Sequence, residues 1–553
     1  MKRFTLAVCL IAVASLGRGA DLPKPDRDDG AITLPPGFRA LVVADDLGPL
    51  RFMTVAANGD IYVKMRTVGI IGLRDTDGDG RAETRAAFGE GGGTGIALQG
   101  GWLYHSTNDA VYRYKLTPGA LAPKGEAERV ISGLPSERQH DSKSFAFDEA
   151  GMLYVEVGSP SNSYGFPDRA KGAKGGDPTE FFKTHGGIWR FDPQRLNQTQ
   201  ADGYHFSSGH RHVLAIARNP VNRSFFVVMM GRDQLNAVAP DFYNDDDNAD
   251  APAEEMHILR EGGSFGWPFT YFDFRKGTRM VAPEYGGDNK KLAEAGKYPD
   301  PLVAFPAHWA PLQMAFYGGT QFPAKYRSGA FVAFHGSWNR APKPQKGYNV
   351  SFVPFNEKGM PSGGYEVFAD GFSGKTEFTV PRDARFRPGG LAVGPDGSLY
   401  VADTEKGRIW RIIYTGEAAA PANTTATPAP PAAAATTARP AAATAAADPG
   451  AMVFDEICAK CHMPDGSGVP NRQPALSPRG LLSGDPTTLI RLVLFGADKV
   501  LPANRQKWEN PMAELSVLSD KEIADGLNYT RRRFANIPST IAPKDVAAQR
   551  AKP

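Results

Sequence analysis

Six stretches of the chain repeat one pattern, and this repetition restricts the possible folds more than any other feature of the sequence. In each stretch, apolar residues alternate with polar ones, a turn with Gly, Asn or Asp follows, and a second apolar strand comes next. The stretches begin at Arg51, Gly93, Ser144, Val213, Gln313 and Gly390. Outer strands are predicted after several of them, from Ala110, Gly187, Gly347 and Gly407. Six such units predict an all-β, six-bladed β-propeller over residues 21–415, with a pair of β-sandwiches as the alternative.

A low-complexity segment separates this body from a smaller one. Residues 416–448 are almost entirely Ala, Pro and Thr. The repeated prolines prevent a continuous helix, and the segment lacks the large apolar residues from which a core is built. We therefore expect a flexible linker that joins the propeller to a second domain over residues 449–545.

The amino terminus is typical of an export signal. Lys2 and Arg3 precede an apolar run from Phe4 to Leu16, and small residues follow at positions 17–20. The run is shorter than the ~20 apolar residues that cross a bilayer. We expect residues 1–20 to be a cleaved signal peptide and the mature protein to be periplasmic without a membrane span. An anchor that is retained uncleaved is the alternative.

The smaller body contains a motif for covalent haem attachment. The sequence CAKCH at residues 458–462 contains Cys458, Cys461 and His462. In this motif the two thiols bond to the haem and the histidine binds the iron. A zinc site would need further Cys or His ligands at suitable spacing, and the third cysteine of the chain, Cys9, lies in the signal sequence. The motif therefore predicts haem c.

The rest of this body has a helical pattern, which disfavours a thioredoxin-like βαβ unit. Helices are predicted over residues 448–458, 485–497 and 518–534, the last with Ser519 and Glu522 as a capping box. The region resembles the class I cytochrome c domain, in which a Met ahead of the last helix is the second axial ligand. This resemblance assigns that role to Met512, whereas Met452 and Met463 lie too close to the haem motif.

Composition excludes some partners of the whole chain. Its 63 Lys and Arg against 60 Asp and Glu give a net charge of +3, which supplies no field for binding nucleic acid. An acidic turn at Asp75, Asp77 and Asp79 resembles the start of an EF-hand loop, but the twelfth position is Ala86. The turn is either a calcium site or a solvated acidic loop.

Titratable and cationic residues near strand ends are the other chemical candidates in the large body. His140 precedes an inner strand and is either a catalytic imidazole or a structural one. Arg211, Arg232, Asp233, Arg385 and Arg387 also stand at predicted strand ends. If these arginines converge on the central face, they suit an anionic cofactor.

Longer motifs connect the large body to a known family. The segments QHDSKSFAF, GHRHVLAIARNP, EGGSFGWPFTYFD and RFRPGGLAVGPDGSLYVADT occur in this order within residues 139–404. Together they resemble the quinoprotein glucose/sorbosone dehydrogenase family. That resemblance implies a six-bladed propeller that binds pyrroloquinoline quinone (PQQ) with calcium.

The resemblance also implies roles for individual residues. His140 is the expected general base, and Lys143 stands where the family often has Arg. The expected PQQ contacts are Lys143, Arg211, Arg232, Asp233, Trp338, Arg340, Arg385 and Arg387. The carbonyl group of Gly231 is an expected calcium ligand. The carboxylates of the acidic turn, Asp75, Asp77 and Asp79, are calcium candidates from the sequence itself rather than from this resemblance. The chain departs from the family pattern at His212 and Asn349, and the acidic insert from Asn244 is expected to be a solvated loop.

These features predict an oxidoreductase with two cofactor domains. A sugar, aldose or polyol would be oxidised through PQQ and calcium, and the electrons would pass through haem c to a soluble cytochrome or a respiratory oxidase. The alternative is a carbohydrate-binding or lactone-hydrolysing propeller with a separate electron-transfer domain. An eight-bladed alcohol dehydrogenase is disfavoured because six repeats are present.

Overall fold

The computed structural model describes most of the two predicted bodies. The described residues are 22–137, 139–416, 448–462, 466, 474–477, 480–504, 512, 515 and 518–551. The predicted signal peptide lies outside them, as do residues 417–447 of the predicted linker. In the part of the chain that is described, no helix is both long and apolar enough to cross a membrane.

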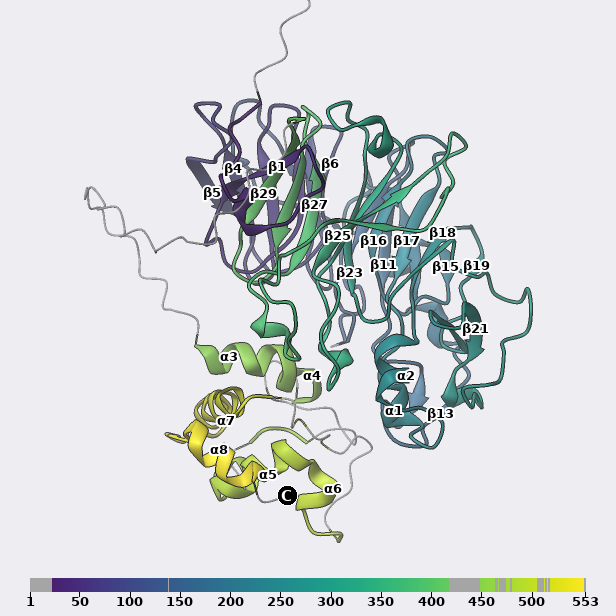
Figure 1. The fold of residues 1–553 in the computed structure, drawn as a ribbon, viewed down its shortest axis with the longest axis vertical. Coiled ribbons are helices and arrows are strands. Elements are labelled where there is room, and N and C mark those ends of the chain that lie inside the picture. Colours follow the sequence, from purple (N-terminus) through teal and green to yellow (C-terminus); the bar gives the residue numbers. More distant parts are fainter. Residues whose placement is uncertain are drawn as a thin grey trace, which may run out of the picture.

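Six β-sheets form a closed ring, which confirms the predicted six-bladed propeller and excludes the two sandwiches. The innermost strands are in contact in a complete cycle, β2–β6–β10–β16–β23–β27 and back to β2. Figure 1 shows this ring from the side, above the helical region. Each of the six repeated hairpins in the sequence supplies the two inner strands of one blade.

The first three blades contain the strands that follow. They are β2 (Leu50–Val55), β3 (Ile61–Met65), β4 (Ile70–Arg74) and β5 (Thr84–Phe88); β6 (Ile96–Gln99), β7 (Trp102–Ser106), β8 (Val111–Lys115) and β9 (Glu128–Ile131); and β10 (Phe145–Phe147), β11 (Leu153–Val157), β14 (Gly187–Phe191), β15 (Tyr204–Ser208) and β19 (Gly263–Ser264).

The other three blades follow the same order from the centre outwards, except that the first strand of the chain completes the last blade. They are β16 (Val213–Arg218), β17 (Phe225–Met229), β18 (Glu254–Ile258) and β22 (Val303–Phe305); β23 (Pro311–Phe316), β24 (Gly329–Phe334), β25 (Asn349–Pro354) and β26 (Glu366–Ala369); and β27 (Pro388–Val393), β28 (Leu399–Asp403), β29 (Ile409–Tyr414) and β1 (Phe38–Ala44). In this closure, Phe38 is opposite Tyr414.

The propeller domain also contains short hairpins and 3-10 turns outside the blade sheets. The two small hairpins are β12 (Gly165–Phe166) with β13 (Lys174–Gly175), and β20 (Thr270–Asp273) with β21 (Thr278–Val281). Single 3-10 turns occur as η1 (Asp29–Ala31), η2 (Phe181–Lys183), η3 (Gln200–Asp202), η4 (Pro283–Tyr285), η5 (Ala324–Tyr326), η6 (Trp338–Arg340) and η7 (Pro381–Asp383).

The acidic insert is not the solvated loop that the sequence suggested. Asn244 caps a short helix, α2 (Asp245–Asp250), which follows α1 (Leu235–Val238). Asp247 and Asn248 in this helix are buried, and the end of the insert enters strand β18 with Glu254 and Glu255 at 2% exposure each. Arginine partners such as Arg279 for Glu255 explain how acidic residues can be buried here.

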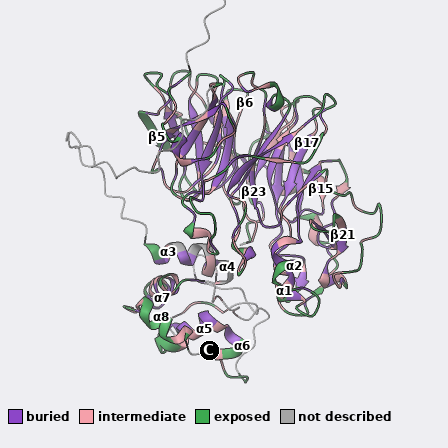
Figure 2. Ribbon diagram, in the orientation of Figure 1, coloured by how far each residue is buried: buried purple, intermediate pink, exposed green. Residues whose placement is uncertain are grey.

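The antiparallel order gives the ring two distinct faces. All six innermost strands begin at one face, here called the lower face because it is turned towards the helical domain in Figure 1. The second strands end there, so that α1, α2, η6 and η7 all project from the lower face. Figure 2 shows that the strands between the two faces are buried. Residues just before an innermost strand or just after a second strand therefore meet at the lower face.

The carboxy-terminal region is helical, as predicted. Its elements are α3 (Pro449–Val453), a π-helical turn η8 (Phe454–Cys458), α4 (Ala459–His462), η9 (Leu481–Ser483), α5 (Pro486–Phe495), α6 (Ala497–Val500), α7 (Asp520–Ala535) and α8 (Pro543–Arg550). The predicted capping box is present, because Ser519 accepts the Glu522 N–H and Glu522 accepts the Ser519 N–H. Leu494, Ile523 and Val546 are central in the core of this domain.

Candidate active site

His140 lies at the lower face in a constrained conformation. Its backbone has φ 56°, and its Nδ1 is 2.5 Å from the carbonyl oxygen of Ser159. A carbonyl accepts only, so Nδ1 carries the proton and Nε2 is the basic nitrogen. Gly158 permits this packing, because a Cβ there would lie 2.5 Å from the His140 carbonyl oxygen. Burial and the neighbouring Arg211 hold the pKa of His140 well below its usual value, which keeps the ring neutral.

A second histidine stands beside His140. The ring centroids of His140 and His212 are 4.9 Å apart. His212 Nδ1 lies 3.0 Å from Oε1 of Glu156, a carboxylate on β11 with no exposed surface. The sequence marked His212 only as a departure from a family pattern, and Glu156 was missed because it looks like one residue of an apolar strand.

Arg211 belongs to a buried ionic network. Its guanidinium pairs with Asp233 and also donates to both the carbonyl and the side-chain oxygen of Asn162, at 3.1 Å each. Arg169 and His308 approach the same Asp233 carboxylate, at 3.2 and 3.3 Å. Although burial alone would raise it, the pKa of Asp233 is held well below its usual range by Arg211 and these neighbours. Two predicted residues, Arg211 and Asp233, are thus in direct contact.

Arg232 has a partner within the protein. Its guanidinium lies 2.5 Å from Oε2 of Glu284, and Ser163 donates to the same carboxylate. Arg232 and Glu284 are both buried. Because this ion pair occupies the guanidinium, the predicted contact of Arg232 with a cofactor remains a prediction.

Gly231, which precedes Arg232 in the chain, has a tightly enclosed backbone. Its N–H donates to Glu254 at 2.8 Å, and a Cβ at this position would lie 2.4 Å from the carbonyl oxygen of Ala253. The carbonyl oxygen of Pro252 would be 2.8 Å from the same Cβ. The position therefore requires glycine, and backbone oxygens gather around it as they do around a hard cation.

Arginines from two further blades meet at the lower face. Arg387 donates to the carbonyl oxygens of His335 and Gly336, at 2.8 and 2.9 Å, and pairs with Glu405 at 3.0 Å. Arg51, at the start of β2, has no hydrogen bond or ion pair with any described residue. Burial and the charges of Arg66 and Arg387 lower the pKa of Arg51 to about 10. Arg51 was missed because a lone Arg beside a strand carries no distinguishing sequence signal.

The remaining predicted residues of this group differ in their accessibility. Lys143 has no exposed surface and donates to the carbonyl oxygen of Asp141 at 2.5 Å, and burial lowers its pKa. Arg340 is 2% exposed and links η6 to α2 through Asp250 at 2.9 Å, which indicates a structural role. By contrast, Trp338 is 38% exposed, and Arg385 is exposed with its guanidinium over Phe386.

The acidic turn lies away from these residues. It connects β4 to β5 at the upper face, opposite the histidines and arginines. Oxygens of Asp75, Asp77, Asp79 and Glu83 lie within 4.8 Å of one another, so a fourth carboxylate joins the three that were predicted. Calcium at this turn stays a prediction, and a role in the chemistry of the lower face is excluded by its position.

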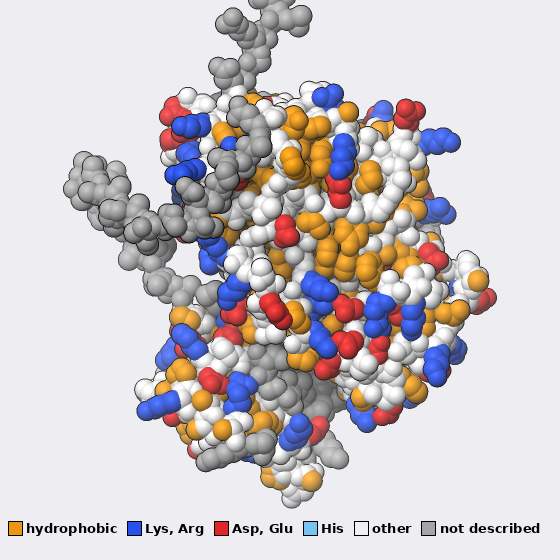
Figure 3. Space-filling model, in the orientation of Figure 1, with side chains coloured by type: hydrophobic (Ala, Val, Ile, Leu, Met, Phe, Trp, Pro, Cys, Tyr) orange, Lys and Arg blue, Asp and Glu red, His pale blue; other side chains and the backbone are white. Residues whose placement is uncertain are grey.

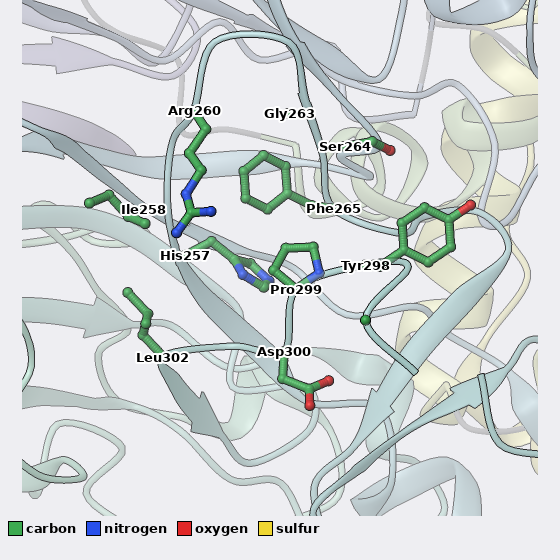
Figure 4. Close-up of a pocket in the computed structure, with 11 residues that line it drawn as sticks. His257, Ile258, Arg260, Gly263, Ser264, Phe265, Tyr298, Pro299, Asp300 and Leu302 are labelled. Atoms are coloured by element: carbon green, nitrogen blue, oxygen red, sulfur yellow. The ribbon is translucent and has the colours of Figure 1, made fainter. Parts of the chain in front are cut away.

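One cavity of the propeller domain is also separate from the predicted residues. A cavity of about 510 Å³ is lined by Phe265, Tyr298, Arg260 and Asp300, among others, on the outer part of the β16–β22 blade. Figure 4 shows these side chains around it. None of the predicted site residues lines this cavity. The candidate site is therefore defined by converging side chains of the lower face rather than by this hollow.

The haem motif occupies the first helical segment of the carboxy-terminal domain. Cys458 ends the π turn and His462 ends α4. His462 Nδ1 is 2.9 Å from the carbonyl oxygen of Pro474, which sets the proton on Nδ1, and its predicted bond to iron stays a prediction. Met512 is partly buried against the domain core. The side chain of Cys461 lies outside the described part of the chain, so its predicted bond to haem stays a prediction, as does the Met512 ligand.

The helical domain touches the lower face of the propeller. Arg382 in η7 lies 3.6 Å from Glu522 in α7, at their closest nitrogen and oxygen atoms. Figure 3 shows charged side chains of both signs along the lower rim of the propeller, on the side of the helical domain. The domain that carries the haem motif and the face that carries His140 are therefore turned towards each other.

Two family models match the chain. A model described as TrAA12-like matches residues 32–415, and one described as Cytochrome c matches residues 447–532.

Two curated relatives match parts of the two bodies. The pyrroloquinoline quinone-dependent pyranose dehydrogenase of Coprinopsis cinerea is 28% identical over 189 residues, 29% of this chain and 25% of that protein. The cytochrome c subunit of the quinone alcohol dehydrogenase of Gluconobacter oxydans is 36% identical over 100 residues, 18% of this chain and 21% of that protein. The chain spans less than half of the length of the curated relatives it matches.

A solved structure shows the same fold. The holo form of the PQQ domain of the Coprinopsis cinerea pyranose dehydrogenase superimposes with a TM-score of 0.57 and 20% sequence identity. The match covers 71% of this chain and 98% of that chain.

Proposed function

The chain belongs to the TrAA12-like family and carries a cytochrome c domain, and from this premise we propose that it oxidises a sugar, aldose or polyol with PQQ and passes the electrons to its own haem. The observation that carries the proposal is that His140 and the cytochrome c domain lie at the same face of the propeller, the lower face. A neutral imidazole with a fixed tautomer, His140, lies on the face of the propeller that the haem-binding domain touches. A base and an electron carrier on one chain suit the oxidation of an alcohol.

The residues at the lower face fit an anionic quinone cofactor. PQQ carries carboxylates, and guanidinium groups bind carboxylates through paired hydrogen bonds. The guanidinium of Arg51 has no hydrogen-bond or ion-pair partner among the described residues, and its pKa is lowered by burial and by the neighbouring charges of Arg66 and Arg387. We infer that Arg51, Arg211, Arg385 and Arg387 hold the cofactor from several blades.

The backbone around Gly231 fits a calcium ion next to that cofactor. Carbonyl oxygens are suitable ligands for a hard cation. The carbonyl oxygens of Pro252 and Ala253 lie close to the position that a Cβ of residue 231 would occupy. When bound, PQQ with calcium supplies a quinone that accepts two electrons from an alcohol carbon, with the metal as a Lewis acid.

His140 performs the proton transfer in this proposal. The substrate hydroxyl donates to Nε2 of His140, and its proton moves to that nitrogen as the carbon is oxidised. The bond from Nδ1 to the Ser159 carbonyl holds the ring during the transfer and stabilises the positive charge that develops on it. A depressed pKa ensures that the ring is neutral, and therefore able to accept, before the substrate arrives.

The cytochrome c domain provides the exit for the electrons. In this proposal Cys458 and Cys461 would hold the haem, and His462 and Met512 would bind its iron. A His/Met pair favours a relatively high reduction potential, which suits an acceptor of electrons. We propose that the protein is exported, with residues 1–20 as signal peptide, and that a soluble cytochrome or a respiratory oxidase takes the electrons on.

The test is haem reduction by a panel of sugars and polyols. Purified full-length protein is supplied with PQQ and calcium, and the haem absorbance is followed after each substrate is added. We expect reduction by at least one member of the panel, and a loss of at least about 100-fold in its rate for His140→Gln, since general base catalysis contributes 10²–10⁴.

The control is His185→Gln, which makes the same substitution at a different histidine. The partner of His185 is Glu137, at 3.0 Å. This variant should keep the wild-type rate. Hydrolysis of sugar lactones without any haem reduction would replace the proposal with the hydrolytic alternative, and undiminished reduction in His140→Gln would refute the role of His140.

A further inference from the structure

Glu156 is a buried carboxylate in a place where strands normally carry apolar side chains. It lies in the middle of a blade on β11, between Val155 and Val157, and has no exposed surface. Burial of a carboxylate is costly unless partners compensate for the lost water. Its Oε1 accepts from His212 Nδ1 at 3.0 Å and from the Val213 N–H at 3.1 Å. The partners of Glu156 therefore lie at the start of the next blade.

The charges around Glu156 come from the lower face. Lys143 has no exposed surface, and acidic neighbours stabilise its positive charge. Glu156 has the strongest effect among these acidic groups. Asp141 acts on Lys143 in the same direction. Glu156 therefore has a buried lysine and two N–H donors, those of His212 and Val213, as neighbours.

This arrangement determines the tautomer of His212. Oε1 of Glu156, which also accepts the Val213 N–H, is the acceptor for Nδ1, so the proton lies on Nδ1 and Nε2 is the nitrogen that His212 offers to a ligand. No described residue bonds to Nε2. His140 repeats the arrangement, since its Nδ1 is bound to the Ser159 carbonyl and its Nε2 is open. Two imidazoles with centroids 4.9 Å apart therefore both bind the protein through Nδ1 and leave Nε2 open.

We propose that His212, positioned by Glu156, binds a second hydroxyl group of the substrate while His140 accepts the proton of the first. The substrate is then a compound with hydroxyls on neighbouring carbons, such as a pyranose or a polyol, rather than a simple monohydric alcohol. This inference rests on the proposed function and adds the residue by which the site would distinguish such a substrate from a monohydric alcohol. His212 contacts the substrate, whereas Glu156 acts through His212 as a positioning residue.

The test compares a substrate with its deoxy analogue. The best substrate of the panel is paired with the analogue that lacks the hydroxyl next to the oxidised carbon, and kcat/KM is measured for both by haem reduction. Wild-type protein should prefer the complete substrate by at least about tenfold, since a buried group left without its partner rejects the analogue. In His212→Ala the preference should fall to about twofold or less.

Glu156→Gln tests the positioning role. Glutamine keeps the shape of the side chain but can also donate to Nδ1, which releases the alternative tautomer of His212. We expect an intermediate preference in this variant, with a raised KM for the complete substrate and an unchanged KM for the analogue. Glu137→Gln is the matched control, because Glu137 also bonds a histidine at 3.0 Å but lies on the surface. It should retain the full preference.

A second readout separates substrate recognition from cofactor binding and from folding. PQQ binding to the variants is titrated by quenching of tryptophan fluorescence, before any substrate is present. The proposal requires that His212→Ala and Glu156→Gln bind PQQ with wild-type affinity within about threefold. Weakened PQQ binding, or an equal loss for substrate and analogue, would overturn it. Absence of haem reduction in wild-type protein with any substrate would instead contradict the proposed function.

Discussion

Asp233 offers the sharpest test of the electrostatic network that holds the candidate site. Asp233→Asn keeps the shape of the side chain and removes the negative charge that Arg211 and Arg169 share. Arg211 is 3% exposed, so its charge would remain in the interior without a counterion. Removal of one partner of a buried pair costs about 3–5 kcal/mol. We expect about 3 kcal/mol, because Arg211 keeps its two bonds to Asn162.

The assay is urea unfolding of the full-length protein followed by tryptophan fluorescence and by haem absorbance. Of the seven tryptophans, only Trp508 follows the linker, so fluorescence reports mainly on the propeller. The midpoint of the fluorescence transition should fall with no change in its slope. The haem transition should stay in place, because Asp233 lies in the other domain.

The control is Asp241→Asn, which removes an exposed carboxylate 3.9 Å from Lys171. It should change stability by less than about 0.5 kcal/mol. Since the folded pKa of Asp233 lies below its ordinary value of 3.8, its contribution is complete above that pH and is lost as the pH falls further. A loss of less than about 1 kcal/mol in Asp233→Asn at pH 7 would refute the reasoning.

Two further predictions concern other charged residues. Lys64→Met should stabilise the propeller by about 1–3 kcal/mol at pH 7, because burial lowers the pKa of Lys64 to about 8. The gain should vanish between pH 8 and 10.5, where the folded wild-type side chain becomes neutral, and a pH-independent gain in thermal unfolding would contradict this cause. Arg382→Glu should slow haem reduction by roughly two- to fivefold at low salt, since an exposed ion pair contributes up to ~1 kcal/mol. The reversed pair Arg382→Glu with Glu522→Lys should restore the rate, and a rate insensitive to both changes in stopped-flow measurements would argue against this contact.

The fold could be predicted from the sequence because each blade is a local unit. A hairpin such as the one that starts at Arg51 contains its own alternation and turn, so no distant residue is needed to recognise it. The closing strand β1 carries the same alternation but was not assigned to a blade, because its partner is β29 at the other end of the domain. The acidic insert was misjudged for a related reason, since the cation that pairs with Glu255 is on the separate strand β21.

The candidate site could be predicted only where a residue stood within a motif. His140 and Arg211 were found in this way, and the haem motif was found by its spacing. Glu156 and Arg51 were missed, because their roles arise from the juxtaposition of blades. Glu156 meets His212 from 56 positions earlier in the chain, a pairing that only the curvature of the ring creates. The local sequence pattern therefore predicts the blades, whereas the contacts between side chains of different blades can be seen only in the folded ring.

The pairing of β1 with β29 has a consequence for how the protein reaches its folded state. Phe38 finds Tyr414 only after the whole intervening chain has been synthesised, so the ring cannot close before β29 has been made. Until then β1 has no partner strand, and its open edge can pair with another chain. Contacts between such distant residues form slowly because a long loop must first be closed. The time that a nascent molecule spends with β1 unpaired should therefore set its tendency to aggregate.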